Sequence, residues 1–247
     1  MSIEKARLDI VLVDRGLAPS RERARALILG GHVTVDGQVV SKAGAPVKPD
    51  ARVDLATPDH PYVGRGGVKL AGALDAFAVD PRGRRALDVG ASTGGFTDVL
   101  LQRGAASVIA IDVGRGQLDW RLRSDPRVLV HEGVNARLLT ADDVPHPVSL
   151  VTIDVAFISL RHILPALPAF LDPAADVVAL VKPQFEAGRD EVGKHGIVSD
   201  PAVHEAVMAR VTGAAAACGL TRMAMAPSAI TGATGNQEFF LHLRAAG

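Results

Sequence analysis

The segment Arg85-Ala-Leu-Asp-Val-Gly-Ala-Ser-Thr-Gly-Gly-Phe96 combines a short apolar run with a glycine-rich turn. Residues 86–89 predict a buried strand, residues 90–95 a tight turn, and residues 97–103, with their helical spacing, a helix. A strand, a glycine-rich turn and a helix in this order are typical of the first unit of a nucleotide-binding α/β sheet. We therefore expect the larger part of the chain to be built around this turn.

The residue types in and around the turn indicate which class of nucleotide ligand it could bind. A dinucleotide site usually carries G-x-G-x-x-G, but Ser92 stands at the place of the second glycine. Asp88 would repel phosphate at a strand end, whereas it suits a ligand with an ammonium group, such as the methionine half of S-adenosylmethionine. Residues 107–112 predict a second strand, and its terminal Asp112 lies about 20 residues beyond the turn, where such folds bind ribose hydroxyls. On these residues alone, a dinucleotide site and a turn without a ligand remain alternatives.

Composition limits the classes of protein to consider. The 247 residues leave room for two domains, and 48% hydrophobic with 22% charged residues is typical of a globular protein. No apolar run approaches the ~20 residues that span a bilayer, and residues 1–7 lead into no signal sequence, so we expect a cytoplasmic protein. Since 27 basic residues balance 27 acidic ones, a nucleic acid would have to be held by a local patch. The single Cys218 and the spacing of the eight histidines predict neither a disulfide nor a metal site.

The N-terminal residues predict a separate small module. Ser20 can cap a helix, and Asp36-Gly37 lies between alternating apolar residues, which is typical of a hairpin. Prolines in residues 57–61 predict a linker. The expected elements are helices at 7–15 and 21–29, a hairpin at 33–40 and an extended segment at 46–55.

The segments Ser20-Arg-x-x-Ala24 and Gly30-Gly-x-Val-x-Val-Asp-Gly37 make this module resemble the S4-type RNA-binding domain, shared by a ribosomal protein, pseudouridine synthases and tyrosyl-tRNA synthetases. From charge alone, the arginines on the second helix would be interpreted as merely solvated. The resemblance instead implies that they contact phosphates and position RNA without reading its bases. The candidate RNA-binding residues are Arg7, Arg21, Arg25, Lys42 and Arg65. The predicted division is an RNA-binding domain at 1–57, a linker at 58–63 and a catalytic domain at 64–247.

The rest of the chain predicts a Rossmann-like α/β fold with a seven-stranded methyltransferase sheet. Residues 184–200 form a charged loop that is either a lid or a mobile surface segment. The last two strands are expected to be an antiparallel pair. Residues 62–70 are expected to lead into an amphipathic helix that runs through about Phe77. The further expected elements are helices at 114–123, from 156 onward and 201–219, and strands at 127–130, 148–154, 176–182, 220–230 and 238–243.

Charged side chains end two of the predicted buried strands. Asp154 ends one and Lys182 the other, and ligands of open α/β sheets bind beyond the carboxyl ends of the strands. Both are therefore expected to converge on the turn that Gly90 opens. Asn135, after the third strand, is a candidate for contacting adenine. Lys69 lies between apolar neighbours and by itself would be an ordinary surface lysine.

Several motifs occur together: Lys69, Asp88-Val-Gly-Ala-Ser-Thr-Gly-Gly-Phe-Thr97, Asp154-x-x-Phe-Ile-Ser-Leu160, Val181-Lys-Pro-Gln-Phe-Glu186 and Gly235-Asn-x-Glu-Phe239. With the N-terminal module, they resemble the TlyA (haemolysin A) family of ribosomal RNA 2′-O-methyltransferases essentially end to end. The resemblance implies S-adenosylmethionine as methyl donor and cytidine in ribosomal RNA as acceptor, and it leaves the subunit, the nucleotide and the oligomeric state open. It also implies the tetrad of FtsJ-like RNA methyltransferases, which falls on Lys69, Asp154, Lys182 and Glu238. The expected cofactor-binding residues are Asp88, Gly90, Ser92, Thr93, Gly94, Gly95, Phe96, Asp112, Val113, Asn135 and Asp154.

The tetrad suggests a mechanism. A ribose hydroxyl must lose its proton as it attacks a methyl group. Lys182 is the candidate base, since the positive charge of Lys69 and partial burial would favour its neutral amine. Asp154 would orient Lys182, while Lys69 and Glu238 would hold the hydroxyl in line.

Two departures from the family pattern and three rival functions accompany this hypothesis. Gly64 replaces a common serine and Tyr62 a tryptophan, which bears on the coupling between the domains rather than on catalysis. A non-catalytic ribosome-assembly factor would share the same fold. A membrane-active haemolysin would need a membrane-spanning or pore-forming segment, which this sequence does not show. An NAD-dependent oxidoreductase would need the glycine that Ser92 replaces.

Overall fold

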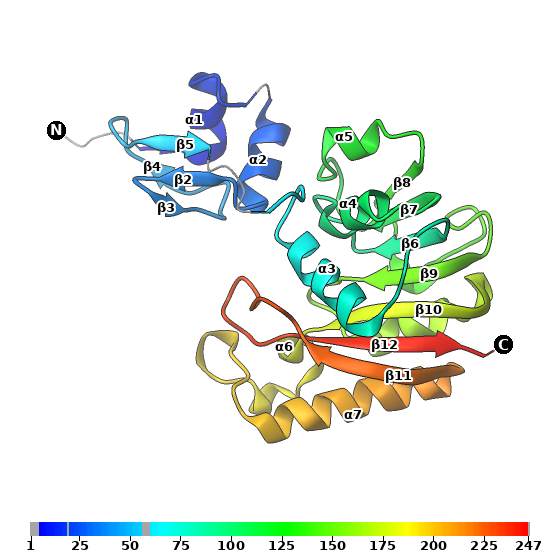
Figure 1. Ribbon diagram of the computed structural model, residues 1–247. Coiled ribbons are helices and arrows are strands. Elements are labelled where there is room, and N and C mark those ends of the chain that lie inside the picture. The colour runs from blue at the N-terminus through cyan, green and yellow to red at the C-terminus, as the bar shows by residue number, and fades with distance from the viewer. Residues whose placement is uncertain (1–4, 19, 56–59, 247) are drawn as a thin grey trace.

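The computed structural model describes residues 5–18, 20–55 and 60–246. A small N-terminal domain lies beside one edge of a larger α/β domain, as Figure 1 shows. The first two residues of the predicted linker at 58–63 fall on residues 56–59, which lie outside the described residues. The segment that follows them leads into α3 (Gly66–Phe77), the helix of the larger domain nearest to the small one in the chain.

Two helices and short strands form the small domain. Ser20 caps α2, because its Oγ accepts a hydrogen bond from the backbone N–H of Arg23 at 3.2 Å, as predicted. Asp36 and Gly37 both have positive φ, 51° and 81°, as the tight hairpin turn requires. Leu12 and Ile28 pack between the helices in a core of their own. The elements are β1 (Ala6–Arg7), α1 (Leu8–Asp14), α2 (Arg21–Leu29), β2 (Val33–Val35), β3 (Gln38–Val39), β4 (Pro46–Val47) and β5 (Val53–Leu55).

A seven-stranded sheet forms the centre of the larger domain, with the order β11-β12-β10-β9-β6-β7-β8. The five strands β6 to β10 run parallel, and β12 inserts antiparallel between β10 and β11. This confirms the predicted seven strands and the closing antiparallel pair. The strands are β6 (Arg85–Val89), β7 (Ser107–Asp112), β8 (Val128–Glu132), β9 (Val148–Ile153), β10 (Leu171–Val181), β11 (Leu220–Pro227) and β12 (Phe239–Ala245).

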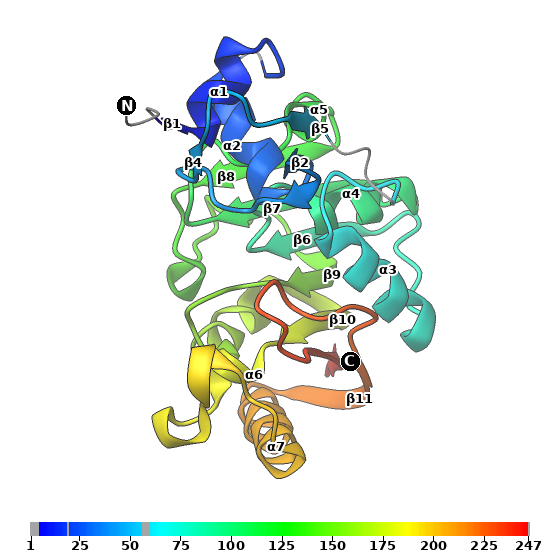
Figure 2. The same cartoon turned by 90° about the vertical axis from the view of Figure 1, so that its left-hand side faces the viewer.

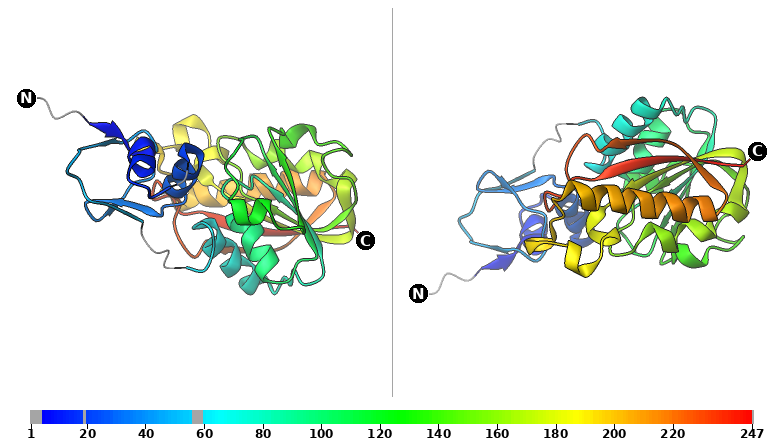
Figure 3. Two further views of the ribbon diagram at one scale, coloured as in Figure 1. Left: turned by 90° about the horizontal axis from the view of Figure 1, so that it is seen from above. Right: turned by 90° about the horizontal axis from the view of Figure 1, so that it is seen from below.

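Helices cover both faces of this sheet, as the views from above and below show (Figure 3), and an apolar layer lies on each face. Alternate residues of a strand face opposite sides, so Leu87 and Val89 of β6 join the layer under α7 (Pro201–Ala217). Ala86 faces the other layer, in which α3 and α4 (Gly95–Gln102) pack. Because helices pack on both faces of the sheet, the central strands carry apolar residues on both sides.

Two predicted helices are wrong or shorter than expected. Within 114–123 only α5 (Trp120–Arg123) is helical, and residues 114–118 form bends beside the turn. No helix follows Asp154 at 156–160: Phe157 has a φ of 64°, and three short 3₁₀ turns, at Leu160–His162, Leu164–Ala166 and Pro168–Phe170, replace the helix. The prolines at positions 165 and 168 cannot donate the backbone hydrogen bonds that a continuous helix needs.

The charged loop at 184–200 is held by hydrogen bonds near both of its ends. It contains α6 (Pro183–Glu186) and two 3₁₀ turns, Arg189–Glu191 and Lys194–Gly196. Asn236, fully buried, accepts a hydrogen bond from the Val198 N–H at 2.9 Å and donates one to the Gly196 carbonyl at 2.8 Å.

Among the described residues, no helix is long and apolar enough to cross a membrane.

Candidate active site

The glycine-rich turn packs tightly against the end of β9. Gly90 has a φ of 85°, and a Cβ at this position would lie 2.3 Å from the backbone oxygen of Asp154. Only glycine fits such a close approach. Ser92, at the place of the second glycine, takes a left-handed φ of 48° and donates its backbone N–H to Oδ2 of Asp112 at 2.8 Å. The ends of β6, β7 and β9 are thereby held together at one point.

The other side of the turn rests on the segment around α5. Gly94 has a φ of 97°, and a Cβ there would lie 2.2 Å from Cδ1 of Leu122. The backbone N–H of Asp119 donates to the carbonyl of Thr93 at 3.1 Å. The turn is therefore fixed both by its own glycines and by this neighbouring segment.

Asp88 is buried below the turn, whereas we expected from the sequence that its carboxylate would face a ligand. Like Ala86 it faces the α4 layer, because alternate residues of a strand share a face. Its side chain is fully buried and accepts hydrogen bonds from Oγ1 of Thr97 at 2.6 Å and of Thr152 at 2.9 Å. Burial raises the pKa of the Asp88 carboxyl to about 7, although these hydrogen bonds act in the opposite direction. Asp88 thus supports the turn from below and is not among the residues that line either cavity described next.

An apolar cavity of about 680 Å³ opens beyond the ends of β7, β8 and β9. Its walls combine apolar side chains with the carboxylate of Asp112 and the side chain of Asn135. Asp112 already accepts backbone hydrogen bonds from Ser92 and Gly114, at 2.8 and 2.7 Å, so its orientation is fixed. Asn135 accepts from the backbone N–H of Arg137 at 3.1 Å and caps the 3₁₀ turn Ala136–Leu138. We call this space the apolar cavity.

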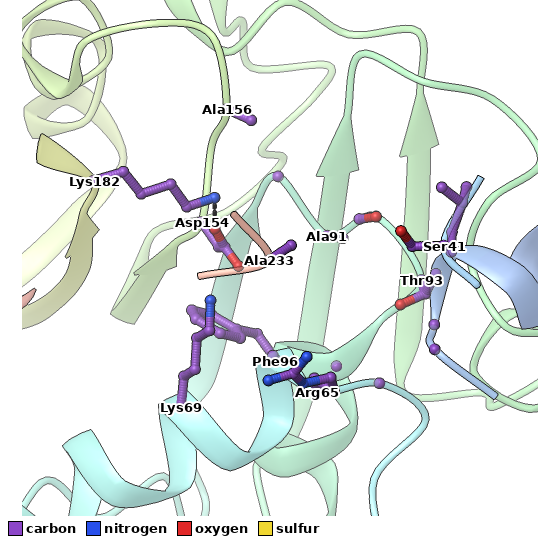
Figure 4. Close-up of a pocket in the computed structure, with 18 of the residues that line it drawn as sticks. Ser41, Arg65, Lys69, Ala91, Thr93, Phe96, Asp154, Ala156, Lys182 and Ala233 are labelled. Atoms are coloured by element: carbon purple, nitrogen blue, oxygen red, sulfur yellow. Dashed lines mark ion pairs between the residues drawn. The ribbon is translucent and has the colours of Figure 1, made fainter. Parts of the chain in front are cut away.

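A second cavity, of about 480 Å³, lies between the two domains, and we call it the lysine cavity. Figure 4 shows Lys69 and Lys182 entering it from different elements, with both ammonium groups pointing toward Asp154. The two cavities meet, because both are lined by Gly90, Ser92, Asp154 and Ala156. A ligand that lies in the apolar cavity can therefore present one end to the two lysines.

Two ion pairs organise the four tetrad residues. Nζ of Lys69 lies 2.6 Å from Oε2 of Glu238, and Nζ of Lys182 lies 2.5 Å from Oδ1 of Asp154. Lys69 comes from the first turn of α3, Asp154 and Lys182 from the ends of β9 and β10, and Glu238 from the residue before β12. Because β12 runs antiparallel to its neighbours, its start lies at the same edge as the ends of the parallel strands. Three of the four residues line the lysine cavity, and Glu238 is buried behind Lys69.

Glu186 is a residue of this site that sequence reasoning missed. Its buried carboxylate accepts hydrogen bonds from Oγ of Ser159 at 2.5 Å and from the backbone N–H of Leu160 at 2.6 Å. Burial raises the pKa of Glu186, while these hydrogen bonds lower it less. Glu186 thereby ties the segment that follows Lys182 to the segment that follows Asp154. The motif Lys182-Pro-Gln-Phe-Glu186 contains the residue, but its partner is set by the fold.

The predicted RNA-binding residues lie in two places. Arg7, Arg21 and Arg25 gather around Asp9 on the small domain, with ion-pair distances of 2.9, 3.1 and 3.9 Å. Arg65 instead lines the lysine cavity next to α3. Lys42 is an exposed residue of the small domain. Figure 2 shows the small domain above the edge where β6, β7 and β8 end.

Contacts between the domains were not predicted. Nη1 of Arg23, on α2, lies 2.8 Å from Oδ2 of Asp119, a nearly buried residue that caps α5. Nε2 of His32 lies 2.9 Å from the carbonyl of Val63. Burial would raise the pKa of Asp119, but hydrogen bonds from Arg121 and Arg23 hold it below its usual value. The small domain also supplies part of the wall of the lysine cavity, through Leu29, Gly30, Gly31, Val39 and Ser41.

The sheet order, the turn and the paired cavities define a methyltransferase fold joined to a small domain of the RNA-binding type. Family models match both parts: an FtsJ-like methyltransferase over residues 62–245 and an S4 domain over residues 6–53. The chain belongs to the FtsJ-like methyltransferase family and, within it, to the TlyA group.

Individual relatives cover nearly the whole chain. It is 48% identical to the 16S/23S rRNA (cytidine-2′-O)-methyltransferase TlyA of Mycobacterium tuberculosis, over 97% of this chain and 90% of the relative. It is 37% identical to the protein named hemolysin A of Brachyspira hyodysenteriae, over 96% and 98%. A solved structure of a hemolysin-named protein from Streptococcus thermophilus is 42% identical, with a TM-score of 0.76 over 99% of this chain and 90% of that one.

Proposed function

We propose that this protein is an S-adenosylmethionine-dependent 2′-O-methyltransferase that acts on the ribose of cytidine in ribosomal RNA. The observation that carries the proposal is the junction of the two cavities beside the glycine-rich turn. Two lysine–carboxylate pairs lie there, with N–O distances of 2.5 and 2.6 Å within the pairs. The TlyA relative supplies the name of the acceptor, cytidine in rRNA. Since ribosomal RNA is the proposed partner, we place the protein in the cytoplasm.

The apolar cavity fits S-adenosylmethionine. Its volume of about 680 Å³ lies within the ~300–1,000 Å³ typical of small-molecule sites. The carboxylate of Asp112 keeps lone pairs for ribose hydroxyls after accepting two backbone N–H groups. Asn135 supplies a polar side chain among apolar residues, next to which adenine would lie. Other residues proposed to line the bound cofactor are Gly90, Ser92, Thr93, Gly94, Gly95, Phe96, Val113 and Asp154.

Bound S-adenosylmethionine would supply an electrophilic methyl group on a sulfonium. The protein's part is then to orient the acceptor hydroxyl and to remove its proton. Lys182 would accept that proton as the general base, and the carboxylate of Asp154 would stabilise the ammonium that forms. Lys69, held by Glu238, would donate a hydrogen bond to the hydroxyl oxygen and align it. Arg7, Arg21, Arg25, Lys42 and Arg65 would bind the phosphates of the RNA.

The test removes the proposed base. Lys182→Ala should lower methyl transfer from labelled S-adenosylmethionine to ribosomal subunits by about 10²–10⁴-fold, the usual contribution of a general base. Its cofactor affinity, measured by isothermal titration calorimetry, should remain close to that of the wild type. Lys48→Ala, an exposed lysine of the small domain, is the matched control and should keep full activity.

Other outcomes would change the conclusion. Substantial turnover by Lys182→Ala would remove this lysine from the mechanism. A wild-type protein that binds cofactor and ribosomal RNA but transfers no methyl group to either subunit would favour the assembly factor instead.

A further inference from the structure

A buried carboxylate lies at the centre of the arginines proposed to bind RNA. Asp9, in the first turn of α1, has a side chain that is fully buried. Oδ1 accepts Nε–H of Arg7 at 2.9 Å, and Oδ2 accepts Nη2–H of Arg7 at 3.0 Å and of Arg21 at 3.1 Å. Nε of Arg25 lies 3.9 Å from Oδ2. Three guanidinium groups from two elements thus converge on one acid.

The backbone fixes Asp9 in this position. Its N–H donates to the carbonyl of Ala43 at 3.0 Å, and the N–H of Leu8 donates to the carbonyl of Ala45 at 2.9 Å. Arg7 lies in β1, which pairs with β4. The hydrogen bonds from Arg7, together with those from Arg21, lower the pKa of Asp9 to about 2, so it is charged at neutral pH. The acid is therefore a rigid part of the small domain.

The arginines, in contrast, stay accessible. The side chains of Arg7, Arg21 and Arg25 are 47%, 58% and 58% exposed. A guanidinium has five N–H donors, and the bonds to Asp9 engage only one edge of Arg7 and one nitrogen of Arg21. With three positive groups around one negative group, the cluster keeps an excess of positive charge. Its outer side can donate to a further anion.

We propose that Asp9 is a positioning residue for RNA binding, which holds Arg7, Arg21 and Arg25 together as a cradle for a phosphodiester of the RNA backbone. Without the acid, the three like charges would separate and each long side chain would be ordered only upon binding. Ordering one such side chain costs about two- to tenfold in affinity. The repulsion between the acid and a phosphate is weaker, since it acts across the arginines and is screened by salt. The proposal rests on the proposed function, because it assumes that these arginines bind RNA.

The proposal predicts that removing the negative charge of Asp9 weakens RNA binding, whereas net charge alone predicts tighter binding. Asp9→Asn removes a negative charge from an RNA-binding surface, yet it should weaken binding to labelled 16S or 23S rRNA by about three- to tenfold in a filter-binding assay at fixed salt. Asp14→Asn changes the net charge equally, at an exposed position of the same helix, and should leave binding unchanged or slightly tighter. Affinity for S-adenosylmethionine should not change in either variant.

A second comparison separates positioning from a general structural role. In an Arg7→Gln/Arg21→Gln/Arg25→Gln background, Asp9→Asn should cause no further loss of RNA affinity, because the three groups it positions are gone. Should Asp9→Asn lose its thermal unfolding transition, Asp9→Glu carries the test: it keeps the charge, displaces the carboxylate by one methylene and should also weaken binding.

Equal or tighter RNA binding by the folded Asp9 variant would overturn the role of Asp9 and leave the methyltransferase proposal intact. Failure of the wild-type protein to bind either RNA would instead overturn the premise that this domain binds ribosomal RNA.

Discussion

Asp88 shows what one buried acid does to the pH dependence of stability. Its pKa is raised to about 7 in the folded protein, against about 3.9 in an unfolded chain. Between these values the unfolded state binds fewer protons, so the free energy of unfolding falls as the pH rises from about 4 to about 7, by at most ~1.4 kcal/mol per pH unit from this group. The stability that Asp88 contributes is thus complete below pH 4 and lost above pH 7.

Replacing Asp88 should make the free energy of unfolding depend less on pH. Asp88→Asn cannot titrate, so its free energy of unfolding, measured with urea from pH 4.5 to 7.5, should change less with pH than that of the wild type. Asp142→Asn, at an exposed position, should keep the wild-type slope. Equal slopes for wild type and Asp88→Asn would show that Asp88 is already ionised at pH 4.5.

Single residues also show where sequence reasoning succeeded and failed. The strand-end positions of Asp154 and Lys182 follow from the apolar runs before them, so their convergence at the sheet edge was predictable. Asp88 lies within the strand on the same side as Ala86, and both sides of this strand are buried. Its charge suggested a ligand, whereas two threonine hydroxyls satisfy it. The pairing of Lys69 with Glu238 joins residues 169 positions apart and depends on the complete sheet order.

Among the elements, the turn between β6 and α4 depends most on glycine. Gly94→Ala would both strain a φ of 97° and place a methyl group 2.2 Å from Cδ1 of Leu122. We expect a loss of unfolding free energy of about 3 kcal/mol or more, since left-handed strain alone costs about 1–2 kcal/mol. Urea denaturation measures this loss.

A second glycine with positive φ provides the control. Gly83 has a φ of 71°, and a Cβ there would meet no atom within 4 Å. Gly83→Ala should therefore cost only the strain of about 1–2 kcal/mol. Similar losses in the two variants would mean that α5 moves away from the turn without cost.

The pattern of apolar residues predicted the strands and the helices α3, α4 and α7, because these elements bury one face or both. It failed for the segments after Asp112 and Asp154. Residues 114–118 have helical spacing, but they bend so that Gln117 can reach the turn, where its Oε1 accepts a hydrogen bond from Oγ of Ser92 at 3.3 Å. Tertiary contacts with the glycine-rich turn outweighed local preference there.

At the level of the whole molecule, the ion pair between Arg23 and Asp119 joins the two domains at 2.8 Å. Since Asp119 also donates its backbone N–H to Thr93 in the turn, the position of the small domain bears on the proposed cofactor site. A double-mutant cycle with Arg23→Gln and Asp119→Asn should give a coupling energy of about 0.5–3 kcal/mol for unfolding.

The matched comparison uses another arginine of the same helix. Arg25→Gln, which faces Asp9, should show no coupling with Asp119→Asn. Additive effects of Arg23→Gln and Asp119→Asn would mean that the pair does not hold the domains together in solution. The Arg23–Asp119 contact was not predictable from the sequence, because it depends on how the two domains are placed relative to each other.

The insertion of β12 between β10 and β11 also leads us to expect a particular order of events during refolding. We expect Glu238 to reach Lys69 only after β12 has paired with both neighbours, whereas α3, the turn and the parallel strands rely on contacts between residues earlier in the sequence. Long-range strand pairing is slow, since the entropy of closing the chain is lost before the contacts form. Chains that have regained most of their helix and parallel sheet should remain inactive, and the return of catalysis should be among the last steps.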